Sequence, residues 1–386
     1  MSVTAAEGFV AAGTHAGIKR RKFDMAMIAT EDGQPVPCVA VFTQNKFVAP
    51  PVELGRSTLL ANGGQAAAVV VNSGNANAGT GQPGYKNAQL MAAATGAALQ
   101  IATSDVLVCS TGIIGTPLPM EPILAHIPKL AKKLSVDGAH DAARGILTTD
   151  HQAKEVVIKG STFTIGGMAK GCGMIAPNMA TMLAFLTTDA EVTRLVMQKA
   201  LKAAADASFN TLNVDGAMST NDTAMLLASG KRGKADPDEF ANAVLAACRD
   251  LTMQMARDAE GMTRMAHLTV SGAAGDKDAR IAAKAIVENN LVKCSWYGGD
   301  PYWGRLMAAA GSTGVALDVE KSRVSYGGIM VAKGGMGCEH DGDALVEHML
   351  GDEVEIEVHL GAGHGSAKMI GIDLGPGYIK ENSKTS

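Results

Sequence analysis

Short apolar runs and longer stretches of helical spacing alternate along the chain. Continuous apolar runs of about four to eight residues are typical of buried strands, and apolar residues about three or four positions apart indicate a helix with one buried face. The pattern predicts strands over 66–71, 105–109, 182–186, 224–228, 267–271, 353–359 and 367–374, and hairpins over 155–168 and 323–332. It predicts helices over 85–99, 119–134, 195–207, 236–261 and 276–289. Because no long linker or repeat interrupts this alternation, we expect layered sheets covered by helices.

The most abrupt change of pattern falls at Thr181. The residues before it, 170–180, form a loop rich in glycine and proline, and those after it, 182–186, are all apolar. A threonine hydroxyl becomes a good nucleophile when the residue's own α-amine, which titrates near pH ~7.7–8.0, takes its proton. That amine exists only if the bond between Ala180 and Thr181 is cut. The pattern therefore fits a self-cleaving N-terminal nucleophile, although the residues alone favour a threonine that merely begins a strand.

Composition narrows the classes of function. The chain has 386 residues, 47% of them hydrophobic, and a net charge of −4 with no long basic run, which argues against nucleic acid as the main partner. It has neither a basic leader before an apolar segment nor a run long enough to span a membrane, so we expect a soluble, cytoplasmic protein. Cys-x-x-Cys, His-Glu-x-x-His, phosphate-loop and Gly-x-Ser-x-Gly motifs are all missing. We therefore expect no metal and no cofactor.

Several polar segments follow predicted strands and helices. The segment 72–79 can present amide and backbone groups, or can equally be a tight surface loop. The segment 110–112 offers a hydroxyl and backbone N–H groups near one point, as an oxyanion requires, but this signal is weak alone. The segment 148–150, Thr-Thr-Asp, is typical of an ordinary turn. Glu260 falls at the end of the predicted helix 236–261, where the helix dipole disfavours a carboxylate, and this hints at a ligand.

The sequence Lys-Gly-x-Gly-Met-Ile-Ala-Pro-Asn-Met-Ala-Thr-Met-Leu at 170–183 resembles the cleavage and nucleophile segment of the ornithine acetyltransferase (glutamate N-acetyltransferase) family of arginine biosynthesis. Further matches run from Gly8-Phe9 to Gly377-Tyr378-Ile379-Lys380, so the resemblance covers nearly the whole chain. It implies an α+β fold, an α-β-β-α sandwich of the self-cleaving N-terminal nucleophile type, with a smaller C-terminal α/β lobe over about 235–345. It also implies two fragments, 1–180 and 181–386, that share one interleaved core and pair into a heterotetramer.

The same resemblance implies a ping-pong reaction. Thr181 takes acetyl from N2-acetylornithine and passes it to glutamate, and the oxyanion hole falls on Thr111 and Gly112. The substrate contacts implied by the family fall on Thr148, Lys170, Thr181, Glu260, Asn382 and Ser386. The family implies no metal or cofactor, and the residues leave open whether acetyl-CoA is a second acetyl donor and whether the enzyme is feedback-regulated.

This chain departs from the family pattern at three places. Ala217-Met218 stands where the family usually has an acidic residue and a threonine, and Tyr302 replaces an asparagine. The C-terminal tail is about one residue shorter, so the assignment to Ser386 is weaker than that to Asn382. Two other functions fit the same sequence. One is an N-terminal nucleophile peptidase or amidase, in which water replaces glutamate, and the other is a non-enzymatic Gly-rich binding protein.

Overall fold

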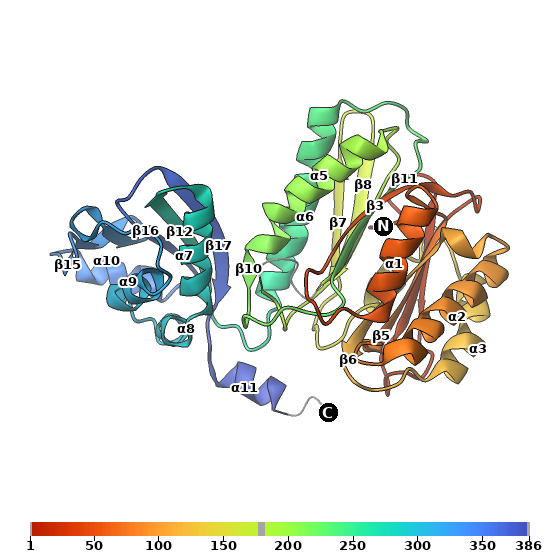
Figure 1. Cartoon of the computed structure of the whole chain (residues 1–386), viewed down its shortest axis with the longest axis horizontal. Coiled ribbons are helices and arrows are strands. Elements are labelled where there is room, and N and C mark those ends of the chain that lie inside the picture. Colours follow the sequence, from red (N-terminus) through yellow and green to blue (C-terminus); the bar gives the residue numbers. More distant parts are fainter. Residues whose placement is uncertain (1, 177–181, 384–386) are drawn as a thin grey trace.

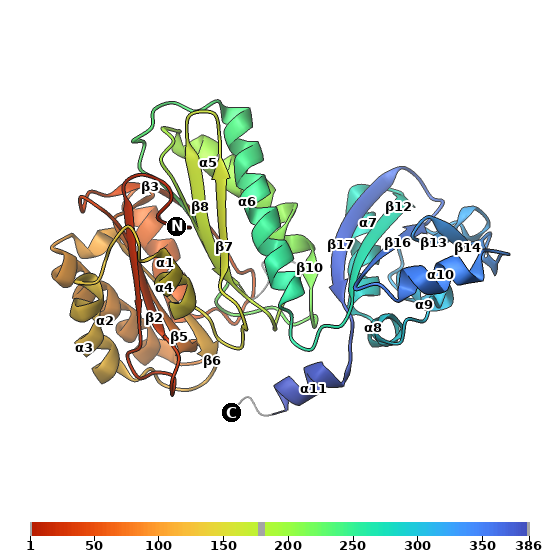
Figure 2. The ribbon, with the colours of Figure 1, turned by 180° about the vertical axis from the view of Figure 1, so that it is seen from behind.

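The computed structural model describes residues 2–176 and 182–383. Two sheets lie face to face in the main body, and helices cover their outer sides (Figure 1). A smaller lobe with its own sheet lies beside the body, and the C-terminal helix runs from the lobe back toward the body (Figure 2).

The first sheet of the body has four strands in the order β1-β2-β5-β6. Its strands are β1 (Phe9–Thr14), β2 (Met25–Thr30), β5 (Ala68–Asn75) and β6 (Val106–Ile113). β5 and β6 are parallel, and the other neighbours are antiparallel. Helices α2 (Gly81–Leu99) and α3 (Met120–Ala131) cover its outer face through an apolar cluster that includes Met27, Met91 and Ile123. Two further helices, α1 (Pro50–Ala61) and α4 (Ala139–Gly145), pack against β6 and β1 respectively.

The second sheet has six strands in the order β4-β3-β11-β9-β8-β7. Its strands are β4 (Gln65–Ala66), β3 (Val36–Phe42), β11 (Thr223–Ala228), β9 (Leu183–Thr188), β8 (Thr164–Lys170) and β7 (Lys154–Lys159). Helices α5 (Arg194–Asp206) and α6 (Pro237–Arg257) cover its outer face. The start of α6 follows from its sequence, because the Asp236 side chain accepts hydrogen bonds from the backbone of Asp238 and Glu239 and Pro237 occupies the first turn.

The core of the body lies between the two sheets. Phe9, Ile28 and Val69 from the first sheet pack with Phe185 and Met225 from the second, and all five are buried. The order of layers is helices, first sheet, second sheet, helices, so the expected α-β-β-α sandwich is confirmed.

The lobe is built on a third sheet of seven strands in the order β10-β17-β12-β16-β13-β14-β15. Its strands are β10 (Leu212–Asn213), β12 (Met265–Ala273), β13 (Arg323–Tyr326), β14 (Ile329–Lys333), β15 (Met336–Gly337), β16 (Glu353–His359) and β17 (Gly365–Ile372). The helices of the lobe are α7 (Asp276–Glu288), α8 (Asn290–Tyr297), α9 (Trp303–Gly311) and α10 (Gly342–Met349), and α11 (Pro376–Asn382) follows. Short 3-10 helices span Thr103–Asp105, Phe209–Thr211 and Val319–Lys321.

The bounds of the lobe differ from the expected range of about 235–345. Apart from β10, its sheet runs from Met265 to Ile372. Helix α6 belongs to the body, because its buried residues Phe240, Val244 and Leu251 join the apolar cluster of the second sheet. The expected strands and helices are otherwise found close to their predicted bounds. The elements that were not predicted include the strands β1, β2 and β3 and the helices α1, α8, α9, α10 and α11.

Candidate active site

Three residues of the predicted site, Ala180, Thr181 and Ser386, lie outside the described residues. The chain that follows Thr181 is held firmly where it enters the second sheet. The backbone N–H of Met182 donates a hydrogen bond of 3.0 Å to Oδ1 of Asp222. The carbonyl of Met182 accepts a 3.1 Å hydrogen bond from the backbone of Thr223. Met182, the residue next to the predicted nucleophile, is therefore anchored at the start of β9.

Lys170 lies next to this anchor. It is the last residue of β8, and its antiparallel partner in β9 is Leu183. Its side chain is only 3% exposed, and its ammonium lies 3.8 Å from a carboxylate oxygen of Asp150. We expected Lys170 at the end of a hairpin on the nucleophile loop, and the structure makes it part of the strand itself. The ladder thus brings Lys170 to the start of β9 across the sheet rather than along the loop.

The residues of the predicted oxyanion hole lie on the first sheet. Thr111 and Gly112 are in β6, which continues through 113 instead of ending in a loop at 109. Gly112 has a φ of +132°, and a Cβ atom there would lie 2.3 Å from the carbonyl carbon of Gly74 in β5. Only glycine fits this close approach of two strands.

A buried asparagine ties this part of the first sheet to the second. The side-chain amide of Asn221 donates to the carbonyls of Ser110 (2.9 Å) and Ala76 (2.6 Å). Asn221 precedes Asp222, which anchors Met182. The predicted oxyanion segment and the residue after Thr181 are therefore connected through two consecutive side chains.

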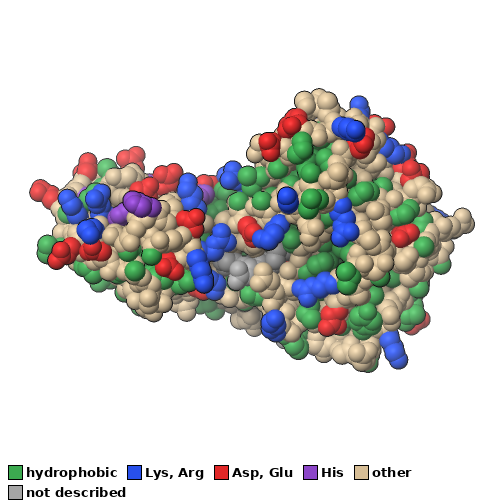
Figure 3. Space-filling model, turned by 45° about the horizontal axis from the view of Figure 1, so that its top comes forward, with side chains coloured by type: hydrophobic (Ala, Val, Ile, Leu, Met, Phe, Trp, Pro, Cys, Tyr) green, Lys and Arg blue, Asp and Glu red, His purple; other side chains and the backbone are tan. Residues whose placement is uncertain are grey.

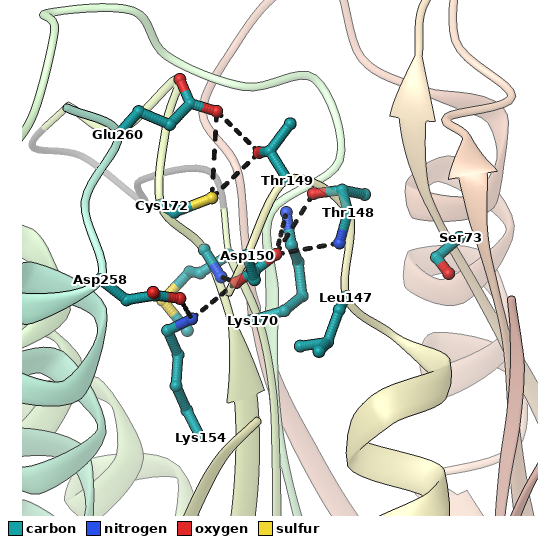
Figure 4. A network of polar contacts seen from close by, with 12 residues as sticks. Ser73, Leu147, Thr148, Thr149, Asp150, Lys154, Lys170, Cys172, Asp258 and Glu260 are labelled. Carbon is teal, nitrogen blue, oxygen red and sulfur yellow. Dashed lines mark hydrogen bonds and ion pairs between the residues drawn. The ribbon is translucent and has the colours of Figure 1, made fainter. Parts of the chain in front are cut away.

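Asp150 is the centre of a buried polar network (Figure 4). One carboxylate oxygen accepts hydrogen bonds from the Lys154 ammonium (2.8 Å) and the Gly171 backbone (2.7 Å). The other accepts from the backbone (2.9 Å) and hydroxyl (3.3 Å) of Thr148. Burial by itself would raise the pKa of Asp150, but the charges of Lys170 and Lys154 hold this pKa well below its ordinary value. Asp150 is therefore a carboxylate that holds Thr148 beside Lys170.

Lys154 extends the network to the end of helix α6. Its ammonium lies 2.5 Å from Asp258, in addition to its contact with Asp150. Burial lowers the pKa of Lys154, and the two carboxylates outweigh this effect and raise it above its ordinary value. The buried cation is thus paired on both sides, which is the arrangement that a charge needs in a protein interior.

We had expected Glu260 to lie at the end of helix α6, but it is not part of that helix. The helix ends at Arg257, and Glu260 lies in the turn that follows, so the argument from the helix dipole does not apply. Beyond the end of the helix, the Asp258 side chain pairs with Lys154, and Gly261, with φ +67°, packs against the backbone of Tyr378. Glu260 is nevertheless only 6% exposed. Its burial, rather than a position on the helix, is therefore the feature that marks Glu260 as a candidate site residue.

Three side chains contact the Glu260 carboxylate, and one of them is the Cys172 thiol, whose sulfur lies 3.9 Å from Oε1. The Thr149 hydroxyl donates to one oxygen (2.6 Å), and the side-chain amide of Asn382 donates to the other (2.8 Å). The Glu260 backbone donates to the carbonyl of Cys172 (2.9 Å). Thr148 and Thr149 are consecutive, and Figure 4 shows them between the Asp150 and Lys170 groups on one side and Glu260 on the other. An anion and a cation are therefore set apart, with hydroxyls between them.

The departures from the family pattern at 217 and 302 have clear structural settings. Asp215 accepts backbone hydrogen bonds from Met174 (2.6 Å), Ile175 (3.0 Å) and Ala217 (3.1 Å). Residue 217 thus contributes its backbone to this cluster, and its side chain is exposed. Tyr302 is exposed in the lobe, and the Arg305 guanidinium lies 5.1 Å from its ring centre.

Sequence reasoning assigned no role in the site to Thr149, Asp150, Lys154, Asn221 and Asp222. One signal was present, since Asp150 and Lys154 are opposite charges four positions apart. Their burial, however, is decided by packing and has no local signature. Within residues 2–176 and 182–383, no group of three or more His, Cys, Asp or Glu side chains could hold a metal ion. No helix in the same ranges is long and apolar enough to cross a membrane.

Comparison with known proteins assigns the family. Residues 10–386 match the model of the ArgJ family. The chain is 43% identical over 397 residues to the arginine biosynthesis bifunctional protein ArgJ of Mycolicibacterium paratuberculosis, covering 100% of this chain and 96% of the relative. It is 42% identical over 391 residues to the protein of the same name from Caldanaerobacter subterraneus, covering 97% of this chain and 96% of that relative.

Two solved structures are also similar to part of this chain. A crystal structure of ArgJ from Bacillus halodurans has a TM-score of 0.49 and 36% identity, covering 52% of this chain and 97% of that one. An ornithine acetyltransferase from Mycobacterium tuberculosis, solved in complex with ornithine, has a TM-score of 0.44 and 38% identity, covering 46% of this chain and 94% of that one. The family match over nearly the whole length decides the assignment. The chain belongs to the ArgJ family and is an acetyltransferase of arginine biosynthesis.

Proposed function

We propose that this acetyltransferase moves acetyl from N2-acetylornithine to glutamate through Thr181, after cleavage of the bond between Ala180 and Thr181. The observation that carries the proposal is the register of β8 against β9. It sets Lys170 opposite Leu183, at the start of the strand that Thr181 precedes. This register supports the proposal, because a buried ammonium that would bind a substrate carboxylate then lies at the start of β9.

The first step is self-cleavage. The Thr181 hydroxyl attacks the carbonyl carbon of Ala180, the C–N bond breaks, and an ester to Oγ replaces the peptide bond. Water then hydrolyses the ester, releasing the carboxylate of Ala180 and a threonine with a free hydroxyl and a free α-amine. The anchoring of Met182 by Asp222 supports this step, because it holds the amide that follows the reacting residue.

In the transfer reaction the α-amine takes the hydroxyl proton, and Oγ attacks the acetyl carbonyl. Thr111 and Gly112 stabilise the oxyanion, and loss of one such donor typically lowers kcat by ~10²–10³. Ornithine leaves with a proton and an acetyl-threonine ester remains. The α-amine of glutamate then attacks the ester carbonyl, the bond to Oγ breaks, Oγ regains a proton in exchange for the one that the amine loses, and N-acetylglutamate leaves. Because the curated relatives are named bifunctional, the proposal includes acetyl-CoA as a second donor, with coenzyme A as the leaving thiol.

The charges in the network match the donor. N2-acetylornithine has an α-carboxylate beside the reacting amide and an ammonium at the end of its side chain. Lys170 would bind the carboxylate and Glu260 the ammonium, with Thr148 between them. Lysine and arginine side chains also gather where the lobe meets the body on the face seen in Figure 3. Such a face favours the approach of carboxylate substrates.

The two fragments would remain together after cleavage. β7 and β8 belong to residues 1–180, whereas β9 and β11 belong to residues 181–386, and all four lie in the second sheet. Cleavage would therefore separate no folded unit. We propose a dimer of such pairs, acting in the cytoplasm, in line with the family resemblance.

Denaturing mass spectrometry tests the proposal. The active enzyme should consist of chains 1–180 and 181–386, and Thr181→Ala should be a single inactive chain. Thr181→Ser should be cut and keep some turnover, because it has the same hydroxyl and amine. The matched control is Thr162→Ala in the exposed turn between β7 and β8, which should behave as the parent. An active parent with one intact chain, or an active Thr181→Ala variant, contradicts the mechanism. Release of acetate without glutamate measures the hydrolase alternative.

A further inference from the structure

The loop between β1 and β2 is wound around one buried carboxylate. Asp24 is 0% exposed and accepts four backbone hydrogen bonds, from Ala16 (2.5 Å), Gly17 (3.1 Å), Ile18 (2.8 Å) and Lys19 (2.9 Å). A carboxylate that accepts several backbone N–H groups fixes the conformation of the segment that supplies them. The backbone of Lys19 is therefore held in one place.

The side chain of Lys19 extends from this loop toward the active site. Its ammonium donates a 2.8 Å hydrogen bond to the carbonyl of Leu147, the residue before Thr148. Its Cγ atom lies 2.7 Å from where a Cβ atom on Gly74 would be, and Gly74 packs directly against Gly112. Lys19 thus lies over the strand that backs the predicted oxyanion hole, and its charge is beside the threonine pair.

The positive charge of the Lys19 ammonium is only partly balanced by nearby carboxylates. Burial lowers its pKa to about 8, and the charges of Asp24 and Asp150 offset this only in part, while Lys22 and Lys170 act in the same direction as burial. Among the described residues no carboxylate lies within ion-pair distance of it, and its hydrogen bond goes to a backbone carbonyl. A half-buried ammonium of this kind is well suited to bind an anion.

The acceptor substrate needs a cation that the donor does not. In a ping-pong cycle ornithine and glutamate occupy the same pocket in turn. Glutamate has a carboxylate where ornithine has an ammonium, and Glu260, which suits the ammonium, repels the carboxylate. Lys170 is already used for the α-carboxylate, which both substrates share. The charge of Lys19 acts on Asp150 and Lys170, so its ammonium lies on the Lys170 side of the described site, where a glutamate side chain turned away from Glu260 would meet it.

We propose that Lys19 determines specificity for the acceptor: its ammonium binds the side-chain carboxylate of glutamate during the second half of the cycle. This inference rests on the proposed transfer to glutamate. The two half-reactions then depend on different residues, because Glu260 binds the ornithine side chain and Lys19 binds the glutamate side chain.

The test compares Lys19→Met, which keeps the apolar stem, with Lys22→Met, a control in the same loop whose side chain is exposed. Acetyl-enzyme is formed with N2-acetylornithine and its burst of ornithine is measured. Its decay is then followed with glutamate, glutamine or ornithine as acceptor. Loss of a contact between a buried cation and a carboxylate typically costs ~2–5 kcal/mol, so kcat/KM for glutamate should fall by about 30-fold or more.

Three results are expected for Lys19→Met alongside this loss. The burst and self-cleavage persist, the rate with ornithine stays within about threefold of the parent, and the preference for glutamate over glutamine collapses. Lys19→Arg should restore most of the preference, and Lys22→Met should match the parent. If Lys19→Met does not fold, Lys19→Gln gives the same readout while keeping a donor for Leu147. An equal loss with glutamate and ornithine, or no loss with glutamate, overturns the inference. Failure of the parent to form acetyl-enzyme would instead refute the proposed function.

Discussion

The side-chain amide of Asn382 donates a 2.8 Å hydrogen bond to the carboxylate of Glu260, although the two residues are 122 positions apart. Helix α11 brings Asn382 there after the chain has passed through the whole lobe (Figure 2). The helix is docked by the Tyr378 hydroxyl, which donates to Asp215 (3.1 Å), and by its close approach to Gly261. The C-terminal helix therefore contacts a carboxylate that we propose binds substrate.

Asn382→Ala should weaken binding of N2-acetylornithine without preventing self-cleavage. A hydrogen bond to a charged group contributes about 1.5–3 kcal/mol, so kcat/KM for the donor should fall by about 10-fold or more. Ser383→Ala, at the exposed end of the same helix, is the matched control and should leave kinetics unchanged. Unchanged steady-state kinetics for Asn382→Ala would show that Glu260 needs no support from α11.

Lys170→Met and Glu260→Gln should each give cleaved protein with poor turnover of N2-acetylornithine. Removing one partner of a desolvated charge contact typically costs ~2–5 kcal/mol, so kcat/KM should be lowered roughly 30-fold or more. Lys159→Met, on the exposed side of β7, is the control for loss of a lysine. Steady-state kinetics within about twofold of the parent for both variants would refute this assignment of the pocket.

Asp150→Asn should destabilise the protein and change its response to acid. The pKa of Asp150 is depressed in the folded state, so its charge contributes stability above the ordinary carboxyl pKa of about 3.9, and this contribution is lost as the pH falls below that value. Breaking a buried ion pair costs about 3–5 kcal/mol at neutral pH. The variant should therefore be less stable than its parent at pH 7, with the gap narrowing in acid.

This comparison is best made by urea unfolding in the Thr181→Ala background, where the chain should be intact. Asp206→Asn removes an exposed partner of Lys202 and should change stability little. Equal loss of stability for Asp150→Asn at pH 7 and in acid would mean that the charge of Asp150 is not what stabilises the network.

For Asp222→Asn, stability relative to the parent should change with pH in the opposite direction to that of Asp150→Asn. Burial raises the pKa of Asp222 well above its ordinary value, and one of its oxygens has no hydrogen-bond partner in the described residues. Its proton therefore stabilises the fold fully below pH ~3.9, and this contribution declines as the pH rises toward the raised pKa. The variant keeps an oxygen to accept from Met182 and avoids this decline. Relative to its parent, it should gain stability as the pH rises from 4 to 8.

Thermal unfolding across this pH range, again in the Thr181→Ala background, measures the gain. Asp222→Ala is the informative second variant, since it leaves the Met182 backbone N–H without its acceptor and should be destabilised by about 1–3 kcal/mol at every pH. A gap between Asp222→Asn and its parent that does not change with pH would show that Asp222 is not protonated in the fold.

The sequence by itself determined the features that depend on neighbouring residues. The apolar run after Thr181 predicts β9, the alternation over 353–359 predicts β16, and Asp236-Pro237 predicts the start of α6. Strand and helix periods, caps and turns are local properties, so they can be read from a few consecutive residues. The motif at 170–183 was long enough to indicate the family, which the comparisons confirm.

The tertiary structure decided which distant groups meet. Lys170 reaches the start of β9 through the register of a sheet, Glu260 accepts a hydrogen bond from Asn382 at the end of the C-terminal helix, and Lys19 reaches from the loop before β2 to the carbonyl of Leu147, beside the threonine pair. Asp258, which follows α6, likewise pairs with Lys154, 104 positions away. Burial and charge pairing depend on contacts between segments about 100 residues apart. No local pattern specifies such contacts, because their free energy comes from packing and desolvation in the assembled fold.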